Sequence, residues 1–235
     1  TKSSYAVTVT VDDTTVGSTP DISSNFTLTN TDVNEAPTAV ALNNQTSTIA
    51  ENADTTTRIK VADIAITDDA LGTETIALTG DDAASFEVDG AVLYLKAGTT
   101  LDFETKSSYA VTITVDDATV GSTPDVSSNF TLTITDVNEA PTAIALFPSS
   151  LSENDAGAIV GDLTTTDADN GDTHTYTVSD NRFTVVNSQL KLIDGISLNH
   201  EAEASVDVTV TASDSGNLFT SETFTITVTN IGVFD

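Results

Sequence analysis

The sequence contains no cysteine, methionine or tryptophan. The absence of cysteine excludes disulfides, zinc–thiolate and iron–sulfur sites, and thiol catalysis. Basic residues are scarce, because 7 Lys and Arg stand against 36 Asp and Glu, which gives a formal net charge of −29. A nucleic-acid backbone binds clustered basic side chains, so this balance excludes nucleic acid as a direct partner. It also disfavours an anionic membrane face, and no long apolar run is present for direct membrane insertion.

The sequence also lacks an N-terminal targeting signal and the motifs of common enzymes. There is no initiator Met and no basic leader, so we expect a segment of a longer protein. The only histidines are His174 and His200, and neither lies in a Ser/His/Asp pattern. The stretch that begins His200-Glu201 lacks the second His of a zinc hydrolase motif. Without Trp, few side chains could form a sugar-stacking subsite for a glycosidase, and we expect no enzyme.

An internal repeat determines the predicted organisation. Residues 1–42 and 105–146 are the same sequence with five differences, at an offset of 104 residues, and 205–230 is a weaker third copy. A period near 100 residues is typical of tandem domains rather than of a solenoid. The sequence DVNEAP recurs at 32–37 and 136–141, and its Pro favours an extended entry into the next unit. We therefore predict the last strands of a truncated repeat (1–33) and two full repeats (34–137 and 138–235).

Apolar residues within each repeat alternate with polar ones, a period of two. Such alternation is typical of strands with one buried and one solvated face. The chain contains 44 Thr, whose branched side chain suits the solvated face of a sheet. The fold class predicted is all-β, with tandem Greek-key β-sandwiches of about seven strands each. Three runs carry the pattern: Tyr109 to Val115, Phe130 to Ile134, and Phe224 to Val228.

Acidic residues recur at corresponding positions of successive repeats. A single Asp or Asn in such a chain more often serves a turn than a ligand, so only recurrence in register indicates a site. The recurring groups are Glu51-Asn52 and Glu153-Asn154, Asp68-Asp69 and Asp167 to Asp172, Leu101 to Glu104 and Leu198 to Glu201, Asp116-Asp117 and Asp214, and the linkers from Asp32 and Asp136.

This order of motifs resembles the cadherin repeat, in particular the bacterial cadherin-like tandem repeats of large secreted or surface proteins. The matched elements are the family's first-strand Glu, its Asp-x-Asp, its Leu-Asp-Arg-Glu, its Ala-x-Asp and its Asp-rich linker before Pro. The resemblance covers the whole chain and implies Ca²⁺ at the junction between consecutive repeats, so that calcium-binding linkers join them end to end.

Carried over residue by residue, the complete junction joins the two full repeats. Calcium takes six to eight oxygen ligands from carboxylates, amides and carbonyls, and this chain offers that chemistry without His or Cys. The resemblance implies these ligands: Glu51, Asp102, Glu104, Asp136, Val137 (with Glu139, through the linker carbonyls), Asn138, Asp167, Asp169 and Asp214.

The junctions at the two ends are less complete. At the first, the implied ligands are Asp32, Asn34, Asp68, Asp69 and Asp116. Aligned on the glycines, Ala70 stands where the second repeat has Asp169, which leaves Asp69 as the substitute. At the far end no linker motif follows Glu153, Asn199 and Glu201, so we expect that site to be empty or weak.

The resemblance implies a calcium-rigidified extender region of a bacterial cell-surface or secreted adhesin, with neighbouring repeats as partners and an extracellular or cell-surface location. An alternative is a calcium-dependent binding module for polysaccharide, or for the same protein on another cell. A further alternative is an accessory module of a secreted hydrolase. Residues 1–33 are expected to pair with a sandwich edge of another copy, or to be a remnant left by proteolysis or cloning.

Overall fold

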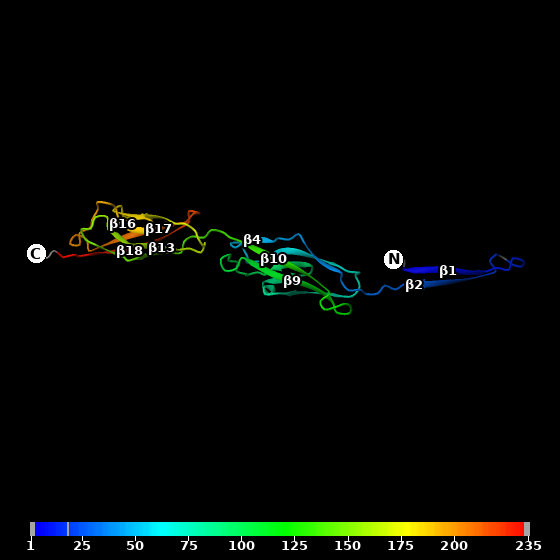
Figure 1. The fold of residues 1–235 in the computed structure, drawn as a ribbon. Helices are drawn as coiled ribbons and strands as arrows, with labels where there is room; N and C mark the ends of the chain where they lie inside the picture. Colours follow the sequence, from blue (N-terminus) through cyan, green and yellow to red (C-terminus); the bar gives the residue numbers. More distant parts are fainter. Residues whose placement is uncertain (1–2, 18, 233–235) are drawn as a thin grey trace. The chain divides into compact units, whose positions relative to one another are not determined.

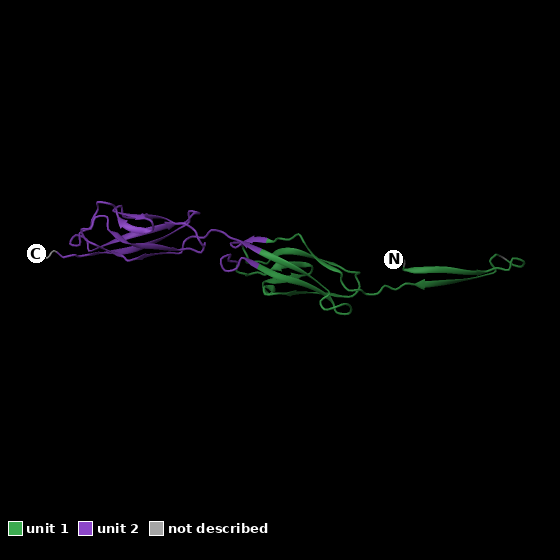
Figure 2. Ribbon diagram, viewed as in Figure 1, with its two compact units in different colours: residues 1–47, 54–100, 109–132 green, residues 48–53, 101–108, 133–235 purple. Residues whose placement is uncertain are grey.

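The structure of the protein is a computed structural model, in which residues 3–17 and 19–232 are described. Contacts divide the chain into two compact units (Figure 2): unit 1 contains residues 1–47, 54–100 and 109–132, and unit 2 contains residues 48–53, 101–108 and 133–235. The described residues form strands and a single 3-10 turn, η1 (Ala83–Ser85). Within that part of the chain, no helix has the length and apolar character to cross a membrane.

Unit 1 contains a sandwich of two sheets. One sheet has the order β3–β5–β8–β7, with all its neighbours antiparallel. The other contains β6, β9 and β10 in that order, and β6 is antiparallel to β9. The last residues of β10 continue into unit 2, where they pair in parallel with β4. The strands are β3 (Ala39–Asn43), β4 (Thr48–Ala50), β5 (Ile59–Thr67), β6 (Glu74–Thr79), β7 (Phe86–Asp89), β8 (Val92–Leu95), β9 (Ser108–Asp117) and β10 (Val126–Thr135).

The core of unit 1 lies between these two sheets. The Phe86 ring on β7 meets the Phe130 ring on β10 edge to face, with the centroids 6.0 Å apart. Perpendicular ring pairs of this kind favour the positive edge of one ring against the negative face of the other. Alternation along β9 buries Val111, Ile113 and Val115, so the predicted period of two has placed these side chains in the core.

Unit 2 repeats the arrangement with a second pair of sheets. One has the order β11–β13–β16–β15 and the other β12–β18–β17–β14, in which β12 is parallel to β18. A core of fifteen buried residues, including Phe183, Leu190 and Val208, fills the unit. Its strands are β11 (Ala143–Phe147), β12 (Ser150–Ser152), β13 (Ile159–Thr166), β14 (Thr175–Val178), β15 (Phe183–Val186), β16 (Gln189–Leu192), β17 (Ser205–Ser213) and β18 (Phe219–Thr229).

Strands β1 (Ser4–Val11) and β2 (Ile22–Thr29) form a separate two-stranded antiparallel sheet, drawn in blue in Figure 1. Local hydrogen bonds define its loop, because the Asp13 amide donates to Asp21 Oδ2 at 2.6 Å. The copy of this loop in β9–β10 has the same bond, from the Asp117 amide to Asp125 Oδ2 at 2.8 Å. The two hairpins therefore share their local structure, although every described side chain of β1 and β2 is exposed.

The predicted fold class, all-β with tandem β-sandwiches, is confirmed. Each sandwich has eight strands rather than about seven, since its first segment divides into two strands that pair with different sheets. In unit 2 these are β11, which pairs with β13, and β12, which pairs with β18. The assignment of residues 1–33, 34–137 and 138–235 to separate repeats stays a prediction.

The exposure of the hairpin and the burial of its copy lead to a direct prediction. Phe130→Ala is expected to lower the free energy of unfolding by about 3–5 kcal/mol, because Phe130 is 2% exposed and its loss leaves a cavity. Phe26→Ala, at the corresponding position of the hairpin, is the control and is expected to change it by less than about 0.5 kcal/mol. Denaturant unfolding followed by circular dichroism measures both, and equal losses would contradict this account of the core.

Candidate functional site: acidic clusters at strand ends

Four carboxylates gather at one end of the β4–β10 pair, in unit 2. Glu51 directly follows β4, and Asp136 directly follows β10. Glu104 lies in the segment before β9, and Glu139 lies in the linker between β10 and β11. Each offers one oxygen, and these four oxygens all lie within 4.8 Å of one another. We call these four residues the linker cluster. Two unit charges about 4 Å apart repel by roughly 4 kcal/mol at a surface-like dielectric, so the arrangement favours a bound cation.

Glu51 is held in place by the backbone on both sides. Its Oε1 accepts the Val137 amide and its Oε2 accepts the Phe103 amide, both at 2.7 Å. One carboxylate thus ties the end of β4 to the linker and to the segment before β9. The predicted ligands Glu51, Glu104 and Asp136 are brought together because these three segments end at the same place.

Repulsion and partial burial perturb the protonation of the linker cluster. Partial burial, followed by the negative charges of the neighbouring carboxylates, raises the pKa of Glu139 to about 7. The same two causes raise the pKa of Asp136. The pKa of Glu104 is also raised: a bond to its own backbone amide lowers it, but burial and the nearby acids outweigh that bond. These carboxyls therefore bind protons more tightly in the folded chain than free carboxyls do.

A second group, which we call the aspartate cluster, contains Asp167, Asp172 and Asp214. One oxygen from each lies within the same 4.8 Å limit, and Asp214 is buried with 5% exposure. Asp167 Oδ2 contacts the Nε2 of the half-buried His174 at 2.7 Å. Backbone amides hold the others, since Leu218 donates to Asp214 Oδ1 at 2.8 Å and Thr173 to Asp172 Oδ1 at 2.6 Å.

Two consecutive linker residues connect these clusters. Asn138 Nδ2 donates to Asp214 Oδ2 at 2.9 Å. The next residue, Glu139, belongs to the linker cluster, and its amide donates to Asp169 Oδ2 at 2.9 Å. The Asp169 amide in turn donates to Asp167 Oδ1 at 3.2 Å. The predicted ligands Asn138, Asp167, Asp169 and Asp214 are therefore close together through short polar contacts.

The same pattern occurs in unit 1, with one residue that the sequence prediction omitted. Asn34 Nδ2 donates to Asp117 Oδ2 at 2.8 Å, so Asp117 corresponds to Asp214. The Glu35 amide donates to Asp69 Oδ2 at 3.2 Å, as Glu139 does to Asp169, so Asp69 takes the place of Asp169 here. Asp32 is exposed, and its negative charge contributes, after other causes, to the raised pKa of Glu35.

Several buried oxygens of this unit 1 group have no hydrogen-bond partner among the described residues. They are both oxygens of Asp68, Asp116 Oδ1 and Asn34 Oδ1. Leaving such atoms buried and unsatisfied costs free energy, and a cation is one way to satisfy them. The predicted ligands Asn34, Asp68 and Asp116 thus present free acceptors.

The end of unit 2 reproduces the backbone pattern with an amide in place of one carboxylate. Glu153 Oε1 accepts the Ile231 amide and Oε2 accepts the His200 amide, both at 3.0 Å, as Glu51 does with Val137 and Phe103. At the position of Asp136 stands Asn230, which donates to Glu201 Oε1 at 2.9 Å. The two amides lower the pKa of Glu153. This end therefore lacks the repulsion that marks the linker cluster.

Three differences separate the predicted residues from the observed clusters. Asp102 bonds within its own turn, to the amide of Thr105 at 2.9 Å and to its hydroxyl at 2.8 Å. Glu139 contributes its carboxylate, whereas the sequence indicated only its carbonyl. Asp172 and Asp117 are additions, and their signal was present: each lies within an acidic run in which the prediction selected other members.

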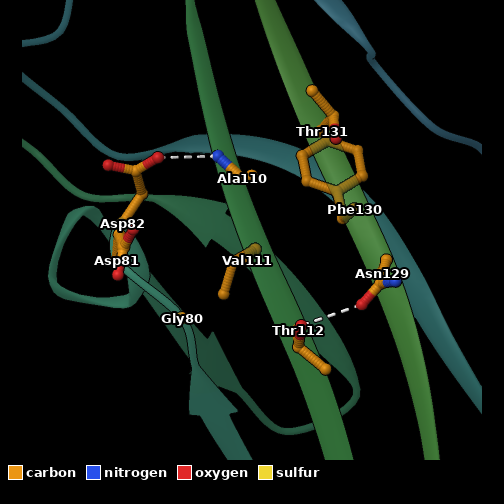
Figure 3. Close-up of a pocket in the computed structure, with 9 residues that line it drawn as sticks. All are labelled: Gly80, Asp81, Asp82, Ala110, Val111, Thr112, Asn129, Phe130 and Thr131. Atoms are coloured by element: carbon orange, nitrogen blue, oxygen red, sulfur yellow. Dashed lines mark hydrogen bonds between the residues drawn. The ribbon is translucent and has the colours of Figure 1, made fainter.

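A surface pocket of about 360 Å³ lies in unit 1, apart from these clusters (Figure 3). On its wall, Asp82 accepts the Ala110 amide at 2.8 Å and Thr112 donates to Asn129 at 2.8 Å. The pocket shares no residue with the acidic clusters. Its lining is Gly80, Asp81, Asp82, Ala110, Val111, Thr112, Asn129, Phe130 and Thr131.

No protein-family model matches the chain, but solved structures do. It is similar to PcdhgB3 EC1-4, with 22% identity and a TM-score of 0.74 over 98% of this chain and 58% of that one. A protocadherin gammaB7 EC3-6 cis-dimer structure matches with 21% identity and a TM-score of 0.70, over 97% of this chain and 57% of that one. The fold is cadherin-like. Human protocadherin-24 EC1-2 also matches, with 20% identity and a TM-score of 0.58, over 83% of this chain and 100% of that one. The chain spans less than two thirds of the first two cadherin structures.

The raised pKa of Glu139 predicts a pH dependence in chelator. Because its folded pKa of about 7 exceeds the ordinary 4.5, its contribution to stability is present at low pH and is lost as pH rises through about 7. The midpoint of thermal unfolding should therefore fall between about pH 5 and 8. Glu139→Gln is expected to flatten this fall, whereas Glu222→Gln on β18 should leave it. If the unfolding midpoint of Glu139→Gln fell with pH as steeply as that of the native chain, Glu139 would not be the source of this pH dependence.

Proposed function

We propose that the chain is a calcium-rigidified extender region of a bacterial cell-surface or secreted adhesin, which supports cell adhesion. The observation that carries the proposal is the linker cluster, with four carboxylate oxygens within 4.8 Å. A second observation supports it, because Glu139 Oε2 is buried without a hydrogen-bond partner among the described residues. Carboxylate, amide and carbonyl oxygens are the ligands that calcium prefers.

The residues present fit calcium at two adjoining places. Glu51, Glu104, Asp136 and Glu139 would hold one ion, and Asp167, Asp172 and Asp214 would hold another. Asp169 contacts both sets, through the Glu139 amide and through Asp167, and Asn138 contacts Asp214. In unit 1, Asn34, Asp68 and Asp116 offer the buried free oxygens, with Asp32 and Asp69 nearby.

The gathered carboxylates would hold the calcium ion, whose positive charge would offset their mutual repulsion. The positions of these residues in the chain determine which segment would be held in one conformation. Glu51 and Asp136 stand at the ends of β4 and β10, while Glu139 and Asp169 belong to the next predicted repeat. A ligand set drawn from both sides of 137/138 would hold the Val137–Glu139 linker in one conformation and resist bending there.

An extracellular location suits this mechanism. Extracellular calcium modules commonly bind with dissociation constants of about 10⁻⁴–10⁻³ M, so such sites fill outside a cell and empty inside it. An acidic chain without cysteine would fold and stiffen after export. The bacterial origin is part of the proposal, and the resemblance of the repeat motifs to bacterial cadherin-like proteins supports it.

A second candidate is a homophilic contact between copies, as part of the calcium-dependent binding module considered above. One structural neighbour is a cis-dimer, which favours this alternative over polysaccharide binding. In that case the linker cluster would hold a surface in place for contact with a second copy, in addition to stiffening the linker.

The extender proposal predicts a calcium-specific gain in stability. At about 100 times the dissociation constant, a bound ion adds roughly 2.7 kcal/mol, which raises the unfolding midpoint by roughly 5–15 °C. Glu104→Gln and Asp136→Asn should each remove most of this rise, because each deletes a linker-cluster charge. Glu222→Gln is the control. Thermal melts in calcium, magnesium and chelator measure the effect, and equal midpoints in calcium and chelator would refute the proposal.

The homophilic alternative makes a different prediction. Sedimentation velocity should show reversible association in calcium that disappears in chelator, with no change when Phe26→Asp removes the apolar character of the β1–β2 hairpin. If the chain sediments as a monomer both in calcium and in chelator, the homophilic alternative is eliminated and the extender proposal is unaffected.

A further inference from the structure

The β1–β2 hairpin carries an exposed apolar face. Val7 lies opposite Phe26, and Val11 lies opposite Ile22. Six side chains define what we call the hairpin face, and they are 53–68% exposed: Val7, Val9, Val11, Ile22, Phe26 and Leu28. A two-stranded hairpin is marginal in water, so this face gains stability from any sheet that covers it.

The copy of this hairpin in β9–β10 shows what fits. At an offset of 104 residues, Val111, Ile113, Val115, Phe130 and Leu132 are 0–2% exposed. The sheet β3–β5–β8–β7 covers them, as the contact between Phe86 and Phe130 shows. Its buried side chains include Val61, Leu93 and Leu95.

In unit 1, β9–β10 already covers the inner face of the sheet β3–β5–β8–β7. The hairpin face can therefore be buried only by a different sheet of the same type. Neither β1 nor β2 contains a charged residue, which suits an apolar partner and provides no repulsion against one. We propose that the hairpin face docks onto the inner face of a four-stranded antiparallel sheet of the β3–β5–β8–β7 type, outside residues 34–235. This inference rests on packing and is independent of calcium.

One of the five differences between the copies adjusts the fit. Asn30 stands where β10 has Ile134, which is 1% exposed. Burial of an amide without a partner is unfavourable, so the docked hairpin is expected to keep this end solvated. Asn30→Ile should therefore strengthen docking.

The test joins a second copy of residues 34–104 directly before Thr1 of the complete chain. Thr1 to Asp32 then follow Glu104 as Thr105 to Asp136 do naturally. Hydrogen exchange by mass spectrometry resolves β1 from β9, because Val9 and Ile113 differ in mass. We expect amide exchange in β1 to slow by about 100-fold or more relative to the unextended chain, towards the rate in β9.

Variants in the extended chain show whether the face is responsible. Val9→Asp should abolish the slowing, since it places a charge on the hairpin face. Thr10→Asp, on the opposite face of the same strand, should preserve it, and Asn30→Ile should increase it. Unchanged exchange on extension, or equal loss in Thr10→Asp, would overturn the proposal. So would slow, concentration-dependent exchange in the unextended chain, because a second copy would then be the partner.

Discussion

The candidate site depends on the backbone hydrogen bonds that Glu51 accepts. Its two oxygens bind the amides of Phe103 and Val137, each at 2.7 Å, which draws three segments together at the end of β4. Glu104, Asp136 and Glu139 then lie near Glu51 because they belong to these segments. Mutual repulsion among four acids is the consequence, and it makes the position suited to a divalent cation.

The end of unit 2 separates the two parts of this arrangement. Glu153 accepts two backbone amides in the same way, so the backbone pattern does not need a cluster of acids. There Asn230 replaces the counterpart of Asp136 and donates a hydrogen bond to Glu201. The pKa of Glu153 is lowered, whereas those of Asp136 and Glu139 are raised. The chain therefore contains one structural motif in two forms: in one, four carboxylates gather, and in the other, the amide of Asn230 takes the place of Asp136.

Much of the fold could be predicted from sequence because its signal is local. Alternation of apolar residues with Thr identified the buried face of β9, and the duplicated segment identified β1 and β2. The division of the first strand of each sandwich could not be seen, because Thr48–Ala50 is a three-residue strand whose partner lies more than 80 residues away. The exposure of Phe26 and the burial of Phe130 were equally hidden, since identical local sequence has different surroundings.

The site was predictable to the level of segments but not of individual acids. The spacing placed Asp116-Asp117 beside the first linker, yet only the structure shows that Asp117 receives the Asn34 amide while Asp116 retains a free oxygen. Neighbouring residues of a strand end point in opposite directions, and motif spacing does not distinguish them when both are Asp. Asp172 shows the same limit, because the conformation of the loop brings its carboxylate close to that of Asp167, and spacing in the sequence does not reveal that conformation.

Equilibrium dialysis of the native chain against calcium tests the central claim most directly. The account predicts saturable binding of at least two ions per chain, one for each cluster of unit 2, with midpoints in the range of about 10⁻⁴–10⁻³ M and much weaker uptake of magnesium. Binding that does not saturate across this range, or that magnesium reproduces equally, would show that the clusters are only solvated acids and would contradict the account.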